Sequence, residues 1–97
     1  MKFPISSYEK LLNNFLPKEF PEIESIWVGK NRLLNMLLVK VYLKPANEQT
    51  GMMSCVRLMQ NIETRIKELS KYIGDGGLCS LDIYFEGKLL CHDAFRM

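Results

Sequence analysis

The segment LLNMLLVKVYLK (Leu33–Lys44) decides the fold of this chain, because its two sets of alternating positions differ in character. The odd-numbered positions from Leu37 to Leu43 are all apolar, whereas the even-numbered positions change from apolar at Leu34 to basic at Lys44. Successive side chains of a strand point to opposite faces of its sheet. The pattern therefore predicts a central strand with one face wholly buried and the other partly covered.

One helix and one strand are predicted before this segment. Ser6 and Glu9 fit a capping box, which marks the start of a helix. Apolar residues then recur at helical spacing as far as Pro17, where we expect the helix to end, because the residue before a proline is pushed out of helical geometry. A strand is expected over residues 23–28, and the polar residues 29–32 predict a hairpin loop.

A longer helix and a second hairpin are predicted after the segment. Apolar residues step by three or four from Met52 to Ile73, and the glycines that follow are typical of a helix end. Glu86-Gly87 then resembles a two-residue hairpin turn, which would place Leu81 opposite His92. A three-residue loop would instead place Asp93 opposite Leu81 in the core. A lone buried carboxylate is costly, so we favour the shorter turn.

The order helix–strand–strand–helix–strand–strand predicts a single α+β domain over residues 1–97. We expect a two-layer sandwich in which both helices cover one face of a four-stranded, mostly antiparallel sheet. A chain of 97 residues suits one hydrophobic core, and 47% hydrophobic with 25% charged residues is the usual globular balance.

Charge, hydropathy and cysteine content narrow the class of partner. The net charge of +2, from 13 basic and 11 acidic residues, lacks the excess of a strong nucleic-acid binder. The chain lacks an apolar run long enough to span a membrane, and Met1–Ser6 lacks the core of a secretion signal, so we expect no membrane partner. Three irregularly spaced cysteines indicate small buried hydrophobes rather than a disulfide framework. The expected location is therefore the cytoplasm.

Residues able to support catalysis do not converge in the sequence. Cys91, His92 and Asp93 are neighbours on a predicted strand, so they alternate between faces and cannot form a hydrogen-bonded relay. We expect His92 near a strand end, half covered by the second helix. The cysteine and histidine spacings do not fit a metal site. The sequence thus predicts no enzyme activity, no metal and no cofactor.

The sheet face opposite the helices is the most suggestive surface. The residues expected on it are Ile23, Trp27, Leu34, Met36, Leu38, Lys40, Tyr42, Asp82, Tyr84, Leu89 and Cys91. A contiguous apolar and aromatic face of this size marks an interaction surface. The partner-binding residues predicted from this pattern are Trp27, Met36, Lys40, Tyr42, Lys44 and Tyr84.

These features favour a small protein-binding module whose partner is another protein or a second copy of the chain. Our preferred hypothesis is an immunity- or inhibitor-type protein that blocks a toxin or enzyme, because blocking needs a complementary surface and no reactive groups. One alternative is a nucleic-acid-binding protein that stacks bases on Tyr42 and Tyr84 and places Lys40 and Lys44 on phosphates. The other is a structural adaptor or a subunit of a homo-oligomer.

Overall fold

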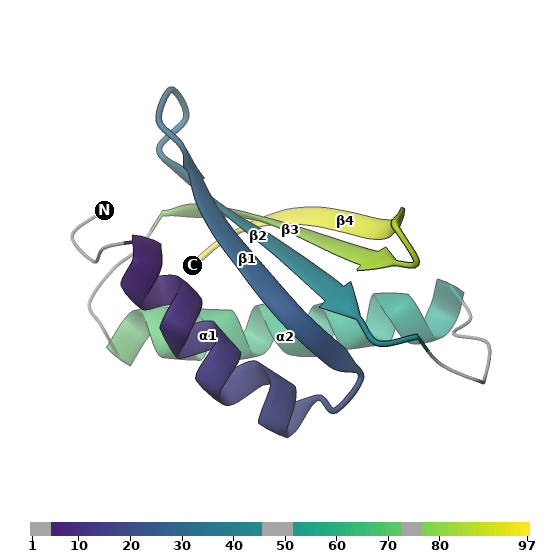
Figure 1. Ribbon diagram of the computed structural model, residues 1–97. Helices are drawn as coiled ribbons and strands as arrows, with labels where there is room; N and C mark the ends of the chain where they lie inside the picture. Colours follow the sequence, from purple (N-terminus) through teal and green to yellow (C-terminus); the bar gives the residue numbers. More distant parts are fainter. Residues whose placement is uncertain (1–4, 46–51, 73–76) are drawn as a thin grey trace.

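The computed structural model describes residues 5–45, 52–72 and 77–97 (Figure 1). The elements are α1 (Ile5–Glu19), β1 (Ile23–Asn31), β2 (Met36–Leu43), α2 (Met52–Tyr72), β3 (Leu78–Phe85) and β4 (Lys88–Arg96). This order confirms the predicted α-β-β-α-β-β succession. Residues 46–51, in the loop expected from Pro45 to Gly51, lie outside the described residues, and so do residues 74–76 at the expected end of the second helix.

The strands of the described part form one four-stranded sheet in the order β1-β2-β3-β4. β1 with β2, and β3 with β4, are antiparallel hairpins, whereas β2 and β3 are parallel in the centre. Parallel neighbours need a crossover connection, and α2 lies in the connection between them. The sheet is therefore mixed but mostly antiparallel, as predicted.

Both helices lie on one face of the sheet, which confirms the predicted two-layer sandwich. α1 packs against β1, α2 packs against β3 and β4, and the two helices touch each other. Figure 1 shows them side by side below the sheet. Between the layers, the odd positions of β2 are buried, from Leu37 and Val41 at 0% exposure to Leu43 at 7%. The strand phase predicted for Leu33–Lys44 is thus confirmed.

α1 also covers the outer edge of β1 with polar side chains. The amide of Asn13 accepts a hydrogen bond from Ile26 N–H (3.0 Å) and donates one to Ile26 C=O (2.9 Å). The Glu9 carboxylate accepts a bond from Val28 N–H at 3.0 Å. Unpaired edge strands invite pairing with other chains, and these side chains satisfy part of that edge.

The predicted end of α1 at Pro17 was wrong, because the helix continues to Glu19 with Pro17 inside it. A proline removes one helical N–H donor, and here it does so within the last turn, where few bonds depend on it. The helix then closes with Phe20 N–H donating to Leu16 C=O at 2.8 Å.

The β1–β2 turn lies later in the chain than predicted. Gly29 and Lys30 pair with Leu38 and Leu37 in the ladder, so the turn falls at residues 32–35 rather than 29–32. Asn35 has a φ of 49°, in the left-handed region that asparagine tolerates better than most residues. Of the residues predicted to form the loop, Gly29 is buried and Lys30 and Asn31 are half-buried in β1, and only Arg32 belongs to the turn.

The β3–β4 hairpin has the predicted two-residue turn but a different register beyond it. Phe85 pairs with Lys88 around Glu86 and Gly87, whose φ angles are 51° and 77°. A β-bulge then shifts the register between Ile83 and Tyr84. As a result Leu81 pairs with Asp93, and the predicted pairing of Leu81 with His92 was wrong.

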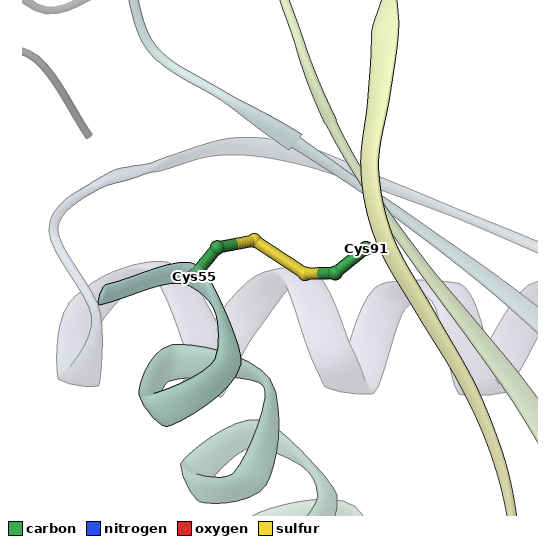
Figure 2. Close-up of a disulfide and its surroundings, with 2 residues drawn as sticks. All are labelled: Cys55 and Cys91. Atoms are coloured by element: carbon green, nitrogen blue, oxygen red, sulfur yellow. A yellow bond between two sulfur atoms is a disulfide. The ribbon is translucent and has the colours of Figure 1, made fainter. Parts of the chain in front are cut away.

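The bulge turns Cys91 towards the helices, where it forms a disulfide with Cys55 of α2 (Figure 2). The two Cα atoms are 6.8 Å apart, at the upper end of the usual range for a disulfide. The expectation that all cysteines are unpaired hydrophobes was wrong for this pair. Cys79 is free and buried, as expected. The disulfide ties the edge strand β4 to the helical layer.

Candidate partner-binding face

The open face is defined here as the side of the sheet that points away from α1 and α2. Its central row runs across all four strands, since the register pairs Trp27 with Lys40, Lys40 with Asp82, and Asp82 with His92. In the described part of the chain both helices lie on the opposite side. Two aromatic side chains on the open face are substantially exposed, Trp27 at 43% and Tyr42 at 37%.

Lys40 links the aromatic residues of the open face. Its Nζ atom lies 5.1 Å from the centroid of the Trp27 ring and 6.0 Å from that of Tyr84. A cation within about 6 Å of an aromatic face is attracted by the ring quadrupole. The long, flexible lysine is therefore held between two rings from different strands, with its charge placed near the middle of the sheet.

The neighbouring row contains the second aromatic contact. Tyr42 on β2 and Tyr84 on β3 are register partners, and their rings stack with centroids 5.4 Å apart and an interplanar angle of 21°. The pair therefore joins the two central strands of the sheet at the end of their ladder. We call Trp27, Lys40, Tyr42 and Tyr84 the aromatic cluster.

Gly29 makes room for the indole of the aromatic cluster. A Cβ atom added at Gly29 would lie 2.2 Å from Cη2 of Trp27. The ring is therefore folded back along β1 over the glycine, which any larger residue would prevent. Sequence reasoning missed this contact because it placed Gly29 in a loop. The spacing could have shown this contact, because Gly29 follows Trp27 by two positions and so lies on the same face of the strand.

Asp82 and His92 form an exposed polar pair beside the aromatic cluster. His92 Nδ1 lies against Asp82 Oδ1, and the side chains are 53% and 21% exposed respectively. In the neutral tautomer Nδ1–H donates to the carboxylate, which leaves the other ring nitrogen for a partner group. The expectation that His92 is half covered by the second helix was wrong, because the bulge in β4 places it on the open face.

The remaining predicted partner-binding residues lie at the ends of the open face. Met36 is half-buried and pairs with Leu78, far along β2 from Tyr42. Lys44 is exposed and follows the end of β2, and its N–H donates to Glu22 C=O at 2.8 Å. The structure thus brings together four of the six predicted residues, while Met36 and Lys44 lie apart from them.

Ile23 and Cys91 were wrongly predicted to lie on the open face. Ile23 is 1% exposed in the core, and Cys91 bonds to Cys55 on the helical side. Each lies next to an irregularity in its ladder, between Ile23 and Ser25 in β1 and opposite Ile83 and Tyr84 in β4. A bulge inserts one extra residue, so each side chain beyond it points to the opposite face of the sheet from the one that strict alternation predicts.

A carboxyl pair lies on the helix side of β4, where α2 crosses it. Burial, and next a hydrogen bond with Asp93, raises the pKa of Glu63 to about 7. The same hydrogen bond is the main cause that lowers the pKa of Asp93. The two directions agree that the shared proton resides on Glu63. Asp93 is exposed in this register, so the cost of burying a lone carboxylate, which argued against the register, does not arise.

One groove lies on the helical side of the molecule. It has a volume of about 560 Å³ and is lined by Phe20, Glu22, Val56, Arg57, Leu58, Gln60 and Asn61. Val56, which the helical stripe predicted to be in the core, is 41% exposed. Within residues 5–45, 52–72 and 77–97, no cluster of three or more histidine, cysteine or acidic side chains could hold a metal ion.

Comparison with known proteins gives no relative for this chain. No family model matches it, and neither a curated protein nor a solved structure is detectably similar to it. Among the helices described, none has the length and apolar character needed to cross a membrane.

Proposed function

We propose that the protein binds another protein through the open face, as an immunity- or inhibitor-type module. The observation that carries this proposal is the aromatic cluster, which is exposed at the centre of a sheet face that the helices leave uncovered. Tryptophan and tyrosine are enriched at the centres of protein interfaces, where they supply much of the binding free energy. Blocking a target in this way needs a complementary surface and no catalytic group.

The side chains of the aromatic cluster already contact one another in the protein without a partner, which supports the proposal. Tyr42 and Tyr84 are stacked on paired central strands, and Lys40 is held by two rings before any partner arrives. Side chains that are fixed in advance lose less conformational entropy on binding, which leaves more of the contact energy for affinity. Asp82 and His92 add a polar margin that can select a partner with matching hydrogen-bonding groups.

The cysteines no longer support the cytoplasmic location that was expected from the sequence. The sequence argument used unpaired cysteines, whereas Cys55 and Cys91 are joined. Disulfides are uncommon in cytosolic proteins, so the pair argues for an oxidising compartment. Fractionation of the native host, with the thiol state of Cys55 and Cys91 determined by alkylation, decides between the two locations.

A comparative affinity purification tests the proposed function. Wild-type protein, the open-face variant Tyr42→Ala with Tyr84→Ala, and the groove variant Arg57→Ala with Gln60→Ala serve as baits in the native host extract. We expect a partner that mass spectrometry finds with the wild type and the groove variant but not with the open-face variant. A partner lost only from the groove variant would transfer the binding role to the helical side.

Nucleic-acid binding is the second candidate, favoured by the exposed aromatic side chains with Lys40 beside them. Bases stack on such rings in single-strand-binding proteins. However, Tyr42 and Tyr84 already use one ring face each on one another. A titration with single-stranded RNA at increasing salt is the test, because phosphate contacts give a steep decline in affinity with salt.

Self-association through the open face is the remaining form of the proposal. A second copy would bury the same residues, so the adaptor or homo-oligomer reading predicts a dimer that Tyr42→Ala with Tyr84→Ala dissociates. Sedimentation velocity of wild type and variant over a range of concentrations distinguishes it from a monomer that binds a different protein.

A further inference from the structure

The β1–β2 turn carries two leucines whose side chains are largely exposed to solvent. Leu33 is 97% exposed and Leu34 is 59% exposed. Figure 1 shows this hairpin projecting beyond the other strands, so the turn lies at an extremity of the molecule. We call Leu33 and Leu34 the leucine tip. Leaving a leucine almost wholly in water has a free-energy cost, which burial elsewhere would recover.

The leucine tip is held in a defined conformation. Asn31 Oδ1 accepts hydrogen bonds from the N–H groups of Leu33 (3.1 Å) and Leu34 (3.3 Å). Asn31 and Met36 close the ladder directly below the turn. Side chains of asparagine often stabilise turns in this way. A tip that is already ordered loses little entropy when its leucines are buried.

The segment of sequence that carries the tip has charges of one sign. Between Glu24 and Glu48 the basic residues are Lys30, Arg32, Lys40 and Lys44, and there is no acidic residue. Lys30 and Arg32 flank the turn directly. The positive charge of the chain, +2 overall, is therefore concentrated on the β1–β2 hairpin.

We propose that the leucine tip inserts into the surface of an anionic lipid bilayer. Leu33 and Leu34 enter the boundary between headgroups and acyl chains, and Lys30 and Arg32 bind the phosphates above them. No membrane partner was expected from the sequence, because it lacks a spanning run and a secretion signal. Insertion into the bilayer surface requires neither, so it is also compatible with the absence of a spanning helix among those described. Apolar side chains combined with basic residues give weak, reversible binding of this kind.

The small contact area that the leucine tip can offer favours a lipid surface over a protein pocket as its binding partner. A specific protein interface buries roughly 800 Å² on each partner, far more than two side chains on a four-residue turn can supply. A bilayer needs no shape match, and its surface potential attracts basic residues that do not touch it. Tyr42 lies at the other end of β2 from the tip, so docking would leave the aromatic cluster available to a protein partner.

Co-sedimentation with lipid vesicles tests the proposal, with phosphatidylcholine vesicles and phosphatidylcholine vesicles that contain phosphatidylserine. We expect the wild type to bind the second kind, less so at high salt, and to ignore the first. Leu33→Ser with Leu34→Ser should bind at least tenfold more weakly. The matched control is Leu89→Ser, which changes a leucine that is 52% exposed on β4 and should bind like the wild type. Thermal unfolding confirms that each variant is folded.

Three outcomes would overturn the proposal. They are no wild-type binding to phosphatidylserine vesicles, equal binding by the tip variant, and equal losses in the tip and Leu89 variants. If the tip variant instead loses its protein partner without any vesicle binding by the wild type, the leucine tip belongs to a protein interface. None of these results affects the open-face proposal, because Tyr42→Ala with Tyr84→Ala tests that surface separately.

Discussion

The two faces of the sheet are built from the same strands but differ in composition and burial. Along β2, Val41 is 0% exposed and the next residue, Tyr42, is 37% exposed. The helix-facing side is aliphatic and closely packed, whereas the open face carries aromatic rings, a lysine and an Asp82–His92 pair. A single step along the chain thus leads from the hydrophobic core to the face proposed for recognition. Substitutions one residue apart should therefore have very different consequences.

The largest expected effect comes from a charge on the helix-facing side. Val41→Asp should unfold the domain, because an unpaired carboxylate in the core costs several kcal/mol against a total stability of about 5–15 kcal/mol. Tyr42→Ser, one residue along on the open face, should remain folded and lose about 1 kcal/mol or less. Urea unfolding followed by circular dichroism measures both. Near-native stability of Val41→Asp would contradict the separation of the two faces.

The next largest effect concerns the link between β4 and the helical layer. The disulfide joins residues separated by 36 positions, and its removal in Cys55→Ala with Cys91→Ala should cost about 4 kcal/mol. Reductant should bring the wild type to nearly the stability of this variant and leave the variant itself unchanged. Cys79→Ala is the control, since it retains the disulfide and should keep the sensitivity to reductant. Indifference of the wild type to reductant would show that the bond contributes nothing.

A smaller effect is expected from the carboxyl pair between α2 and β4. The folded protein raises the pKa of Glu63 from 4.5 to about 7, so protonated Glu63 is favoured in the folded state. Its stabilising contribution is complete below pH 4.5 and is lost as the pH rises through 7. The lowered pKa of Asp93 has the opposite effect on stability. Its contribution is present above the ordinary pKa of the carboxyl group, 3.8, and is lost as the pH falls below that value.

Glu63→Gln removes this titration while keeping a neutral donor towards Asp93. Relative to the variant, the wild type should lose stability between pH 4.5 and 7, by less than the effect of the disulfide because solvent screens the pair. Thermal unfolding of both proteins across this range is the measurement. Parallel stability curves for the two proteins would show that Glu63 does not share its proton with Asp93.

The smallest expected effect on stability comes from Gly29→Ala on the open face. The new Cβ would lie 2.2 Å from the Trp27 ring, so the indole must move away from Lys40. We expect a loss of about 1 kcal/mol or less together with a shift of the tryptophan emission to longer wavelength. Trp27 is the chain's single tryptophan, so the signal has one source. Ser25→Ala on the same strand is the control, and equal spectra for all three proteins would contradict the packing at Gly29.

Much of this arrangement could be predicted from local patterns. The alternation from Leu37 to Leu43 identified the buried side of β2, and helical spacing identified both helices. Once the buried side was known, the alternation of side chains along each strand placed Trp27, Lys40, Tyr42 and Tyr84 on the opposite face. The structure brings these four residues together. Whether they bind a partner stays a prediction.

The errors arose where side chains stop alternating strictly between the two faces of a strand. Irregularities beside Ile23 and opposite Ile83 reverse the facing of the strand, and alternation in the sequence carries no sign of an extra residue. The bulge in β4 is compatible with the core because Cys91 bonds to Cys55, while Asp93 stays exposed beside Glu63. Both partners lie on α2, distant in sequence, so a strand-by-strand reading could not have found them.

The central claim, that the open face is the binding surface, is tested most directly at Trp27. The protein is labelled with 5-fluorotryptophan, which places one fluorine in the aromatic cluster and none in an unlabelled partner. When the partner recovered by affinity purification is added to saturation, our account predicts that the ¹⁹F resonance shifts and becomes protected from solvent. The Tyr42→Ala with Tyr84→Ala variant should need roughly 30-fold more partner for the same change, which corresponds to about 2 kcal/mol. A resonance that stays unchanged while the partner is fully bound would contradict the account.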